Sequence, residues 1–209
     1  MLCKANLSRA NLNEVNLSEG NLSGANLSGA KPRGANLSET NLTAANLCKA
    51  NLIDAKLILA NLCGANLERA ELTTANLTAA DLSRASLDGA NLSEANLSRV
   101  NLSGANLTGV NLHRANLIEA KLILTDLLGA NLELAELTKA NLTEADLSWA
   151  HLGGANLSGA NLRRAILTDV NLSSAILRGA DLVDAKLGQV KMNKVDLSWV
   201  IMPNGTVDN

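Results

Sequence analysis

Aromatic side chains are almost missing from this chain. Its 209 residues include no Phe or Tyr, and aromatic residues make up 1% of the total, represented only by Trp149 and Trp199. Proteins that hold single-stranded nucleic acids stack bases on several aromatic rings, so the chain lacks the usual equipment for that activity. Leu, Ala and Asn together supply nearly half of the residues. This composition is not typical of ordinary globular packing.

Three other features are scarce. The 18 basic and 20 acidic residues nearly cancel, which gives neither a basic patch for phosphates nor an acidic tail. No apolar run approaches the roughly 18 residues of a membrane helix, and no charged-then-apolar leader is recognisable. The cysteines, Cys3, Cys48 and Cys63, are odd in number and scattered, which argues against a disulfide framework. We therefore expect a cytoplasmic protein with no membrane association and no direct nucleic-acid binding.

A five-residue repeat fills the chain. Counted in fives, 38 of the 41 central positions are Leu, the exceptions being Pro32, Met192 and Met202. Two residues before the centre there are 30 Ala and seven Val, and the residue between is Asn in 23 units and Asp in five. The position after the centre is Ser or Thr in 20 units. The repeating unit is thus A-N-L-S-x, whose members are called its first to fifth positions below.

The period excludes a helix and a flat strand. In an α-helix, a five-residue step places each Leu roughly 140° around the axis from the last one, so the Leu residues form no stripe. In a flat strand, an odd period sends successive Leu side chains to opposite faces of the sheet. The chain must therefore turn after every unit, with three extended residues pointing Leu and Ala inward and Asn outward, and two residues at the corner. Right-angled corners would give 20-residue coils stacked at roughly 4.8 Å, about ten of them, with outward columns of Asn. Periodicity alone does not choose four sides over three.

The repeats resemble a known family. The segments ANLSGANLSGA (25–35), ANLTAADLS (75–83) and ADLSWA (145–150) are similar to the pentapeptide-repeat family, and the ending VIMPNGTVDN (200–209) resembles that of cyanobacterial members. The resemblance covers the whole chain and implies an all-β fold, a right-handed quadrilateral parallel β-helix. We expect one such solenoid over 1–200 and a carboxyl-terminal cap or tail over 201–209. The chain departs from the gyrase-protecting members, because its core positions contain no Phe.

Catalytic and metal-binding interpretations find little support. Ser93, His113 and Glu133 are spaced by 20 and should share one column, but that column is a flat, solvated surface without a pocket or an oxyanion donor. His151 belongs to another column, and no phosphate-loop motif occurs. We therefore predict no enzyme activity, no metal and no cofactor. Pro32 cannot donate a ladder hydrogen bond, so we expect a local bulge or a shifted coil there.

The sequence favours a non-catalytic scaffold that presents a rigid β-helical surface to a protein partner. The alternative is a DNA-mimicking inhibitor or protector of a topoisomerase such as gyrase, against which stands a charge balance within one unit on each of four faces. Two surfaces are candidates for contacts. The predicted partner surface is a belt of outward aliphatic residues, and the predicted cap or homodimer contact through a terminal coil lies near the carboxyl end. The belt is Ile118, Ile123, Leu124, Leu128 and Leu134; the cap is Val195, Val200, Ile201 and Met202.

Overall fold

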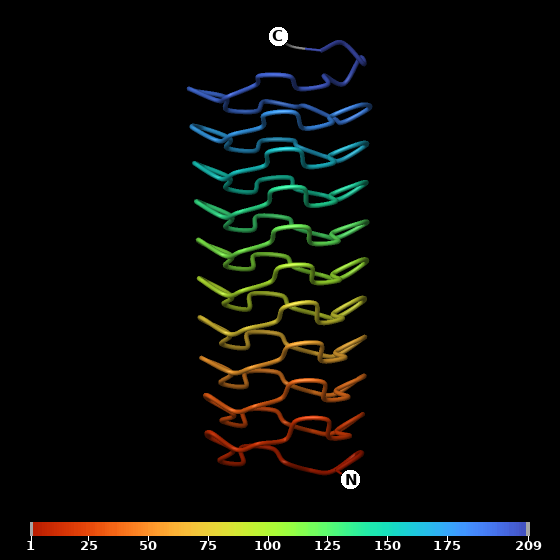
Figure 1. Ribbon diagram of the computed structural model, residues 1–209, viewed down its shortest axis with the longest axis vertical. Coiled ribbons are helices and arrows are strands. Elements are labelled where there is room, and N and C mark those ends of the chain that lie inside the picture. The colour runs from red at the N-terminus through yellow and green to blue at the C-terminus, as the bar shows by residue number, and fades with distance from the viewer. Residues whose placement is uncertain (1, 208–209) are drawn as a thin grey trace.

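Parallel β-bridges join residues that lie 20 positions apart, and the chain climbs as a stack of similar coils (Figure 1). The computed structural model describes residues 2–207. The bridges run from Asn6↔Asn26 to Asp181↔Ile201, always at the second position of a unit. Four units therefore complete one coil, as predicted, and a 15-residue coil is excluded. Within residues 2–207 no helix and no continuous strand occurs, so single bridged residues replace the three-residue extended segments expected from the repeat.

The four sides of the coil can be named by their central residues. Successive units lie on faces 1, 2, 3 and 4 in turn, and a residue stacks on the one 20 positions later. The first and last central residues are Leu2 and Met202 for face 1, Leu7 and Leu187 for face 2, Leu12 and Met192 for face 3, and Leu17 and Leu197 for face 4.

Each corner is a tight turn made by the fourth and fifth positions. Every fifth-position residue from Lys4 to Trp199 has a positive φ, between 29° at Gln189 and 67° at Gly104. In most units the following first-position N–H donates to the preceding Leu carbonyl, as in the 2.9 Å bond from Ala65 to Leu62. This is the pattern of a turn with a left-handed third residue. Glycine suits that conformation, yet 29 corners hold other residues. The corner is therefore imposed by the coils around it.

A single unit shows how the backbone N–H groups are satisfied. In the unit 105–109, the N–H of Ala105 closes the turn on Leu102, that of Asn106 donates to Ala85 in the preceding coil at 3.0 Å, and those of Leu107 and Gly109 donate to the following coil at 2.7 and 2.8 Å. The remaining N–H, of Thr108, donates to Oδ1 of Asn106 at 2.9 Å. All five donors are thus paired, as buried or crowded backbone requires.

The side-chain cap recurs throughout the rod. Each of the 23 Asn and five Asp at second positions accepts the N–H of the fourth-position residue through Oδ1. Bonds between stacked Asn side chains, which a side-chain ladder would need, occur in the described residues at only three pairs. Asn is therefore used mainly to cap its own turn, and the expected Asn ladder is largely wrong.

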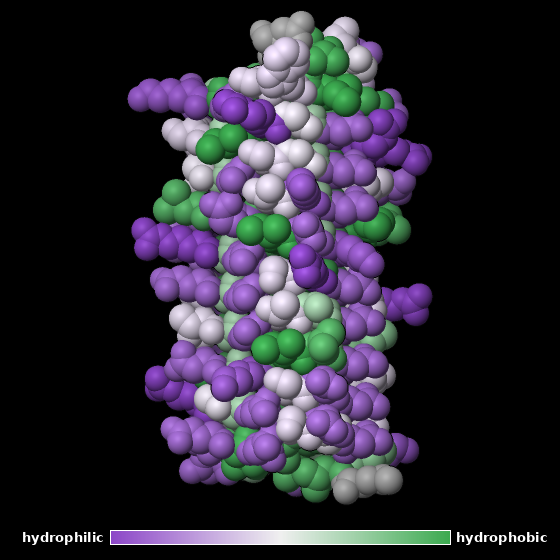
Figure 2. Space-filling view, in the orientation of Figure 1, coloured by the Kyte–Doolittle hydropathy of each residue, from purple (hydrophilic) through white to green (hydrophobic). Residues whose placement is uncertain are grey.

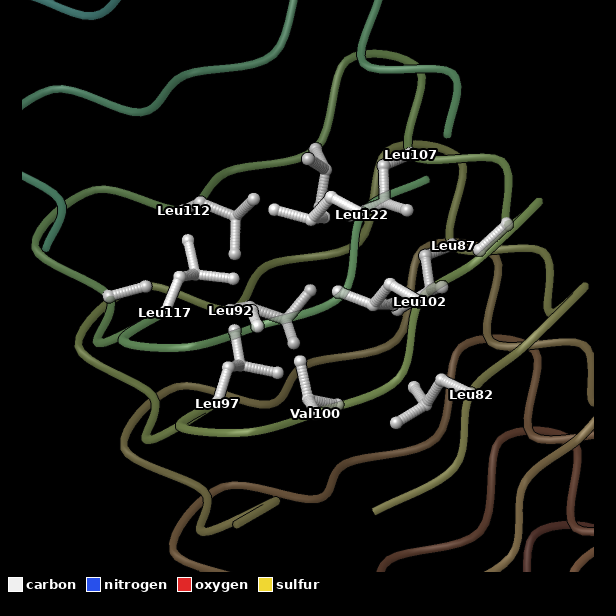
Figure 3. Packing of buried hydrophobic residues seen from close by; sticks show 14 of the residues in the cluster. Leu82, Leu87, Leu92, Leu97, Val100, Leu102, Leu107, Leu112, Leu117 and Leu122 are labelled. Carbon is white, nitrogen blue, oxygen red and sulfur yellow. The ribbon is translucent and has the colours of Figure 1, made fainter. Parts of the chain in front are cut away.

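Leu and Ala fill the interior in layers (Figure 3). The central Leu residues from Leu22 to Leu182 are at most 2% exposed. The repeat predicts burial of every central Leu from Leu7 to Leu197, and this prediction is wrong at both ends. Leu7, Leu12, Leu17, Leu187 and Leu197 are only partly buried, because a terminal coil has a neighbour on one side only.

Pro32 leaves the coil regular. Its side chain is buried like that of a central Leu, and the next turn closes normally with a 3.1 Å bond from Ala35 to Pro32. The N–H of Gly34 still reaches Ile53 at 2.9 Å. The expected bulge is therefore wrong, and the cost of Pro32 is one missing donor, at the place where the ladder has no bridge between Lys31 and Asn51.

Two buried threonines replace Ala in the core. Thr40 and Thr125 are 0% and 1% exposed. Their hydroxyls donate to the carbonyls of Leu17 and Leu102 at 2.9 and 3.0 Å, so neither polar group is left unpaired.

Polar side chains dominate the surface. In the view of Figure 2 hydrophobic side chains form separate small groups on a largely hydrophilic rod. Within residues 2–207 no helix is long and apolar enough to cross a membrane.

Candidate interaction surface

The predicted belt residues lie on different sides of the rod. Ile118 is on face 4, Ile123 and Leu124 are on face 1, Leu128 is on face 2 and Leu134 is on face 3. Leu124 is 62% exposed, while Ile123 is half-buried. Because the faces point in four directions, a partner with a flat contact surface reaches only part of the belt. The structure thus brings these residues to one height but not into one patch.

The backbone explains why Leu124 and Leu134 protrude. Both occupy fifth positions with φ of 56° and 58°, where the side chain leaves the corner toward solvent. A leucine gains nothing from the core at such a position and adopts a conformation that L-residues seldom favour. Lys, Arg or Glu fills the same position in many other units. The two leucines are therefore not required by the fold.

Exposed tryptophans are a feature that the sequence reasoning missed. Trp149 and Trp199 are 61% and 64% exposed, more than most aliphatic residues of the belt, and both have a φ of 63°. Each ends a D-L-S-W segment, so its fifth position was readable from the repeat. Trp and Tyr are enriched at the energetic centres of protein interfaces. Exposed Trp at a corner is accordingly a stronger marker of contact than a lone aliphatic residue.

A shallow groove runs beside Trp149. It has a volume of about 280 Å³ and lies between the fifth-position column of face 2 and the second-position column of face 3. Its walls are Trp149, Asp169 and Gln189 on one side and His151, Asn171 and Lys191 on the other. Ala150 and the indole ring add apolar surface to these polar walls. Such a hollow suits an extended side chain of a partner better than a small-molecule substrate.

The histidine column does not assemble a catalytic group. Ser93, His113 and Glu133 stack on face 3 as their spacing predicted, and the backbone N–H of Glu94 donates to the His113 carbonyl at 2.9 Å. No side-chain hydrogen bond links the three within residues 2–207. In the same range no cluster of three His, Cys, Asp or Glu side chains has the arrangement of a metal site.

The three thiols are separate in the structure. Cys3 is exposed, while Cys48 and Cys63 are half-buried on neighbouring faces. All three are free, and the Cys3 sulfur accepts a hydrogen bond from the Ser23 hydroxyl at 3.2 Å.

The carboxyl end folds back on the last coil. Ile201 still bridges Asp181 in the parallel ladder and also pairs antiparallel with Val207. The N–H of Met202 donates to Thr206 at 2.7 Å, which closes a turn at Asn204-Gly205. Of the other predicted cap residues, Val200 is 0% exposed and Val195 is half-buried. The last two residues of the predicted tail, 208 and 209, lie outside the described part.

Five ion pairs link adjacent coils, all at partly or fully exposed positions. Arg178 contacts Asp196 at 3.3 Å. The pKa of Asp196 is lowered mainly by the hydrogen bonds from the Ser198 hydroxyl and then the Ser198 backbone N–H; burial opposes them less strongly, and the nearby Arg178 charge lowers the pKa a little further. Each exposed pair is worth little by itself.

The comparisons with known proteins place the chain in context. The pentapeptide-repeat family model matches at residues 2–31, 33–62, 55–94, 75–114, 95–133, 115–154 and 145–184. The curated sequences that were compared gave no match. Among solved structures, HetL of the cyanobacterium Nostoc sp. strain PCC 7120, a pentapeptide repeat protein involved in heterocyst differentiation regulation, is 37% identical over 96% of this chain and 92% of its own, with a TM-score of 0.42.

Two further structures extend the comparison. Full-length QnrB1, a plasmid-mediated fluoroquinolone resistance protein, is 18% identical over 84% of this chain and 92% of its own, with a TM-score of 0.51, a likeness of fold alone. Rfr23 of the cyanobacterium Cyanothece 51142 is 36% identical over 51% of this chain and 63% of its own, with a TM-score of 0.33. The family matches span far more than half of the sequence, and the chain belongs to the pentapeptide-repeat family.

Proposed function

We propose that this chain is a non-catalytic, cytoplasmic binding scaffold, a rigid right-handed rod of about ten coils that presents its outward side chains to a protein partner. The observation that carries the proposal is the contrast between the backbone and the surface. Units such as 105–109 pair all five backbone N–H groups, bury their Leu and Ala, and use the second position as a cap, which leaves the fourth and fifth positions free to vary. Aliphatic and Trp side chains at those positions add exposed apolar area that the fold does not use.

The test compares two matched double variants as bait in cross-linked capture. Leu124→Lys with Leu128→Lys changes the belt, and Ile58→Lys with Leu59→Lys changes one fourth and one fifth position of the earlier KLIL segment. Lys occupies fifth positions such as Lys49, and Arg occupies fourth positions such as Arg163, so we expect both variants to keep the circular dichroism and the melting temperature of the wild type. Loss of capture in the first variant alone supports the belt. Failure of the wild-type rod to capture any protein would refute the scaffold function.

The topoisomerase alternative has less support. The faces carry 5 basic and 4 acidic groups, 4 and 5, 5 and 5, and 4 and 5, so no face is more than one charge from neutral. A duplex of roughly 48 Å carries something like 28 negative charges. The likeness to QnrB1 is of fold alone and does not offset that difference.

We also propose that Val195, Val200, Ile201 and Met202 close the carboxyl end of the rod, either as a cap or as a homodimer contact. The folded-back turn at Asn204-Gly205 covers part of the last coil and favours the cap. Light scattering during gel filtration decides between the two, because a dimer through this end would become a monomer in Met202→Lys. If the wild type has the mass of a single chain, the homodimer contact is excluded and the cap is retained.

A further inference from the structure

Leu128 and Trp149 lie close together on face 2. Leu128 is in the fourth position of its unit, and Trp149 is in the fifth position of the unit one coil later. The backbone N–H of Gly129 donates to the carbonyl of Ser148 at 2.9 Å, so the two corners stack directly. No atom lies within 4 Å of the place where a Cβ on Gly129 would be, which leaves the space next to the indole open. Ile166, half-buried, follows in the next coil on the same face.

The same part of face 2 is locally acidic although the whole face is nearly neutral. Between Ser86 and Asp169 its outward positions hold four carboxylates and no Lys or Arg. The basic residues of the face lie earlier, at Arg9, Lys49 and Arg69, or later, at Lys186. Counting charges over a complete face therefore hides their separation along it. The four carboxylates are Asp88, Asp126, Asp146 and Asp169.

Two of these carboxylates are stacked on each other. Asp126 and Asp146 form one parallel bridge, and their Oδ1 atoms cap the N–H groups of Leu128 and Ser148 at 3.0 and 2.9 Å. Asn performs the same capping in 23 other units without a charge. Like charges on directly opposed residues are destabilising. The fold therefore uses one oxygen of each Asp and gains nothing from the negative charge.

The stacked pair also differs from the later Asp residues at second positions. Asp181 is paired with Arg163 at 2.9 Å and Asp196 with Arg178 at 3.3 Å, in each case from the fourth position of the coil before. The corresponding positions for Asp126 and Asp146 are Thr108 and Leu128, which carry no charge. In the part of the chain that the structure describes, no salt bridge involves Asp126 or Asp146. Asp126 is exposed and Asp146 is half-buried, on the same face as the exposed Leu128 and Trp149.

We propose that this surface, the face-2 patch formed by Asp126, Leu128, Asp146, Trp149 and Asp169, docks a protein segment that carries Lys or Arg side chains next to an aliphatic residue. The proposal rests on the scaffold function and names its partner by charge complementarity. Cationic groups of the segment meet the stacked carboxylates and the face of the indole, and the aliphatic residue packs on Leu128. The groove beside Trp149 receives a long side chain, and Lys186 marks where the acidic stretch of face 2 ends.

The edges of the patch are consistent with this partner. On the side of face 1, Glu144 and Arg164 neutralise each other at 2.8 Å, and Leu124 adds exposed apolar area. The four carboxylates of this stretch are far fewer than the phosphates of a DNA duplex of the same length. Their number suits contacts with the basic side chains of one peptide segment, and it is too small to imitate the charge of a nucleic acid.

The first experiment uses short peptides as probes. In a Trp199→Phe background Trp149 is the only tryptophan, and its fluorescence reports binding at the patch. The probes are a hexapeptide that alternates Lys and Leu, a Glu and Leu counterpart, and a Lys and Ser counterpart. We expect the Lys and Leu peptide to bind at least about tenfold more tightly than either counterpart. Raising the salt from roughly 0.05 to 0.3 M weakens this binding several-fold.

Matched variants show whether the stacked charges are responsible. Asp126→Asn with Asp146→Asn keeps both caps, because Asn is the common residue at that position, and should weaken the Lys and Leu peptide about tenfold. Asp81→Asn on face 1 makes the same chemical change away from the patch and should have no effect. Unchanged affinity in the double variant, an equal effect of Asp81→Asn, or no binding of the Lys and Leu peptide up to millimolar concentration would each overturn the proposal.

A second readout separates this proposal from the scaffold function. Cross-linked capture is repeated with Asp126→Asn/Asp146→Asn and Trp149→Gly, and with Trp199→Gly on face 4 as the control. Capture by the wild type that is lost in the face-2 variants and retained in the control supports the patch. Capture that is equal in all of them refutes the patch while leaving the scaffold function intact.

Discussion

Replacing Leu107 by Ala tests whether the rod depends on its inner layers of leucine. Leu107 is 1% exposed in a middle coil, between Leu87 and Leu127 of the same face. The substitution removes three carbons, worth about 2.4 kcal/mol at about 0.8 kcal/mol for each buried group. The stacked backbone ladders on both sides resist collapse into the space, so a cavity penalty is added and the loss comes to about 3 to 4 kcal/mol.

The end of the rod provides the internal comparison. Leu12 has the same position in its unit but is only partly buried, since the first coil has no earlier neighbour. Leu12→Ala should therefore cost about half as much, roughly 1.5 kcal/mol. Leu107→Asp carries the same argument further, because it places an unpaired charge in the apolar interior and should prevent folding or cost several kcal/mol.

Urea denaturation followed by circular dichroism gives the free energy of unfolding for each variant. Hydrogen exchange of the middle and terminal coils is measured alongside, because a repeat protein can lose its end coils before its centre. Equal losses for Leu107→Ala and Leu12→Ala, or a loss below about 1 kcal/mol at Leu107, would refute the layered-core explanation.

Three further predictions concern the cap, the Asp196 carboxyl group and the charge balance. Asn96→Ala leaves the N–H of Ser98 without its 3.1 Å partner and should cost about 1 kcal/mol in urea denaturation, whereas Asn96→Asp retains the cap and should cost clearly less. The pKa of Asp196 is lowered in the folded state, so the ionised carboxylate stabilises the fold above the unfolded pKa of about 3.9, and this stabilisation is lost as the pH falls through the folded pKa. The difference in free energy of unfolding between the wild type and Asp196→Asn should therefore vanish in strong acid. A difference that persists in strong acid would contradict this explanation. The rod should not inhibit gyrase supercoiling, because its faces are nearly neutral, and salt-sensitive inhibition at low concentration would restore the DNA-mimic alternative.

Much of the architecture was predictable because the repeat is strict. A Leu at almost every fifth residue excludes one helical or strand face, and the 20-residue contact spacing follows from four corners. What the periodicity did not give is the use of the Asn side chain. Whether Oδ1 of a residue such as Asn106 reaches the stacked Asn or its own turn depends on the corner geometry, and the positive φ at the fifth position decides in favour of the turn.

The behaviour at irregular positions was also hard to predict from the sequence. The sequence predicts that Pro32 distorts its coil, but the turn bond from Ala35 to Pro32 and the inter-coil bond from Gly34 to Ile53 hold the backbone in place. The ends were expected to be as buried as the middle, yet burial depends on neighbours above and below, which the pattern of a single unit does not contain. Both errors arise from treating one unit in isolation when the coil is held by its stack.

For the candidate surface, the sequence identifies the outward residues, but only the stacked structure shows which of them lie together. Its residues were all readable, but their grouping required the stacking register: five aliphatic residues close in sequence are distributed over four faces, whereas Leu128 and Trp149, 21 residues apart, share one corner. The register also stacks Asp126 on Asp146, which makes two ordinary second-position residues a concentrated charge. The fold requires apolar residues at the first and third positions and, for the cap, one side-chain oxygen at the second position. Selection for binding can therefore change the other outward side-chain groups with little cost to the stability of the fold. Departures from the repeat that neither fill the core nor cap a turn are therefore where recognition by this rod should be sought, and the face-2 patch is the place where apolar and charged departures coincide.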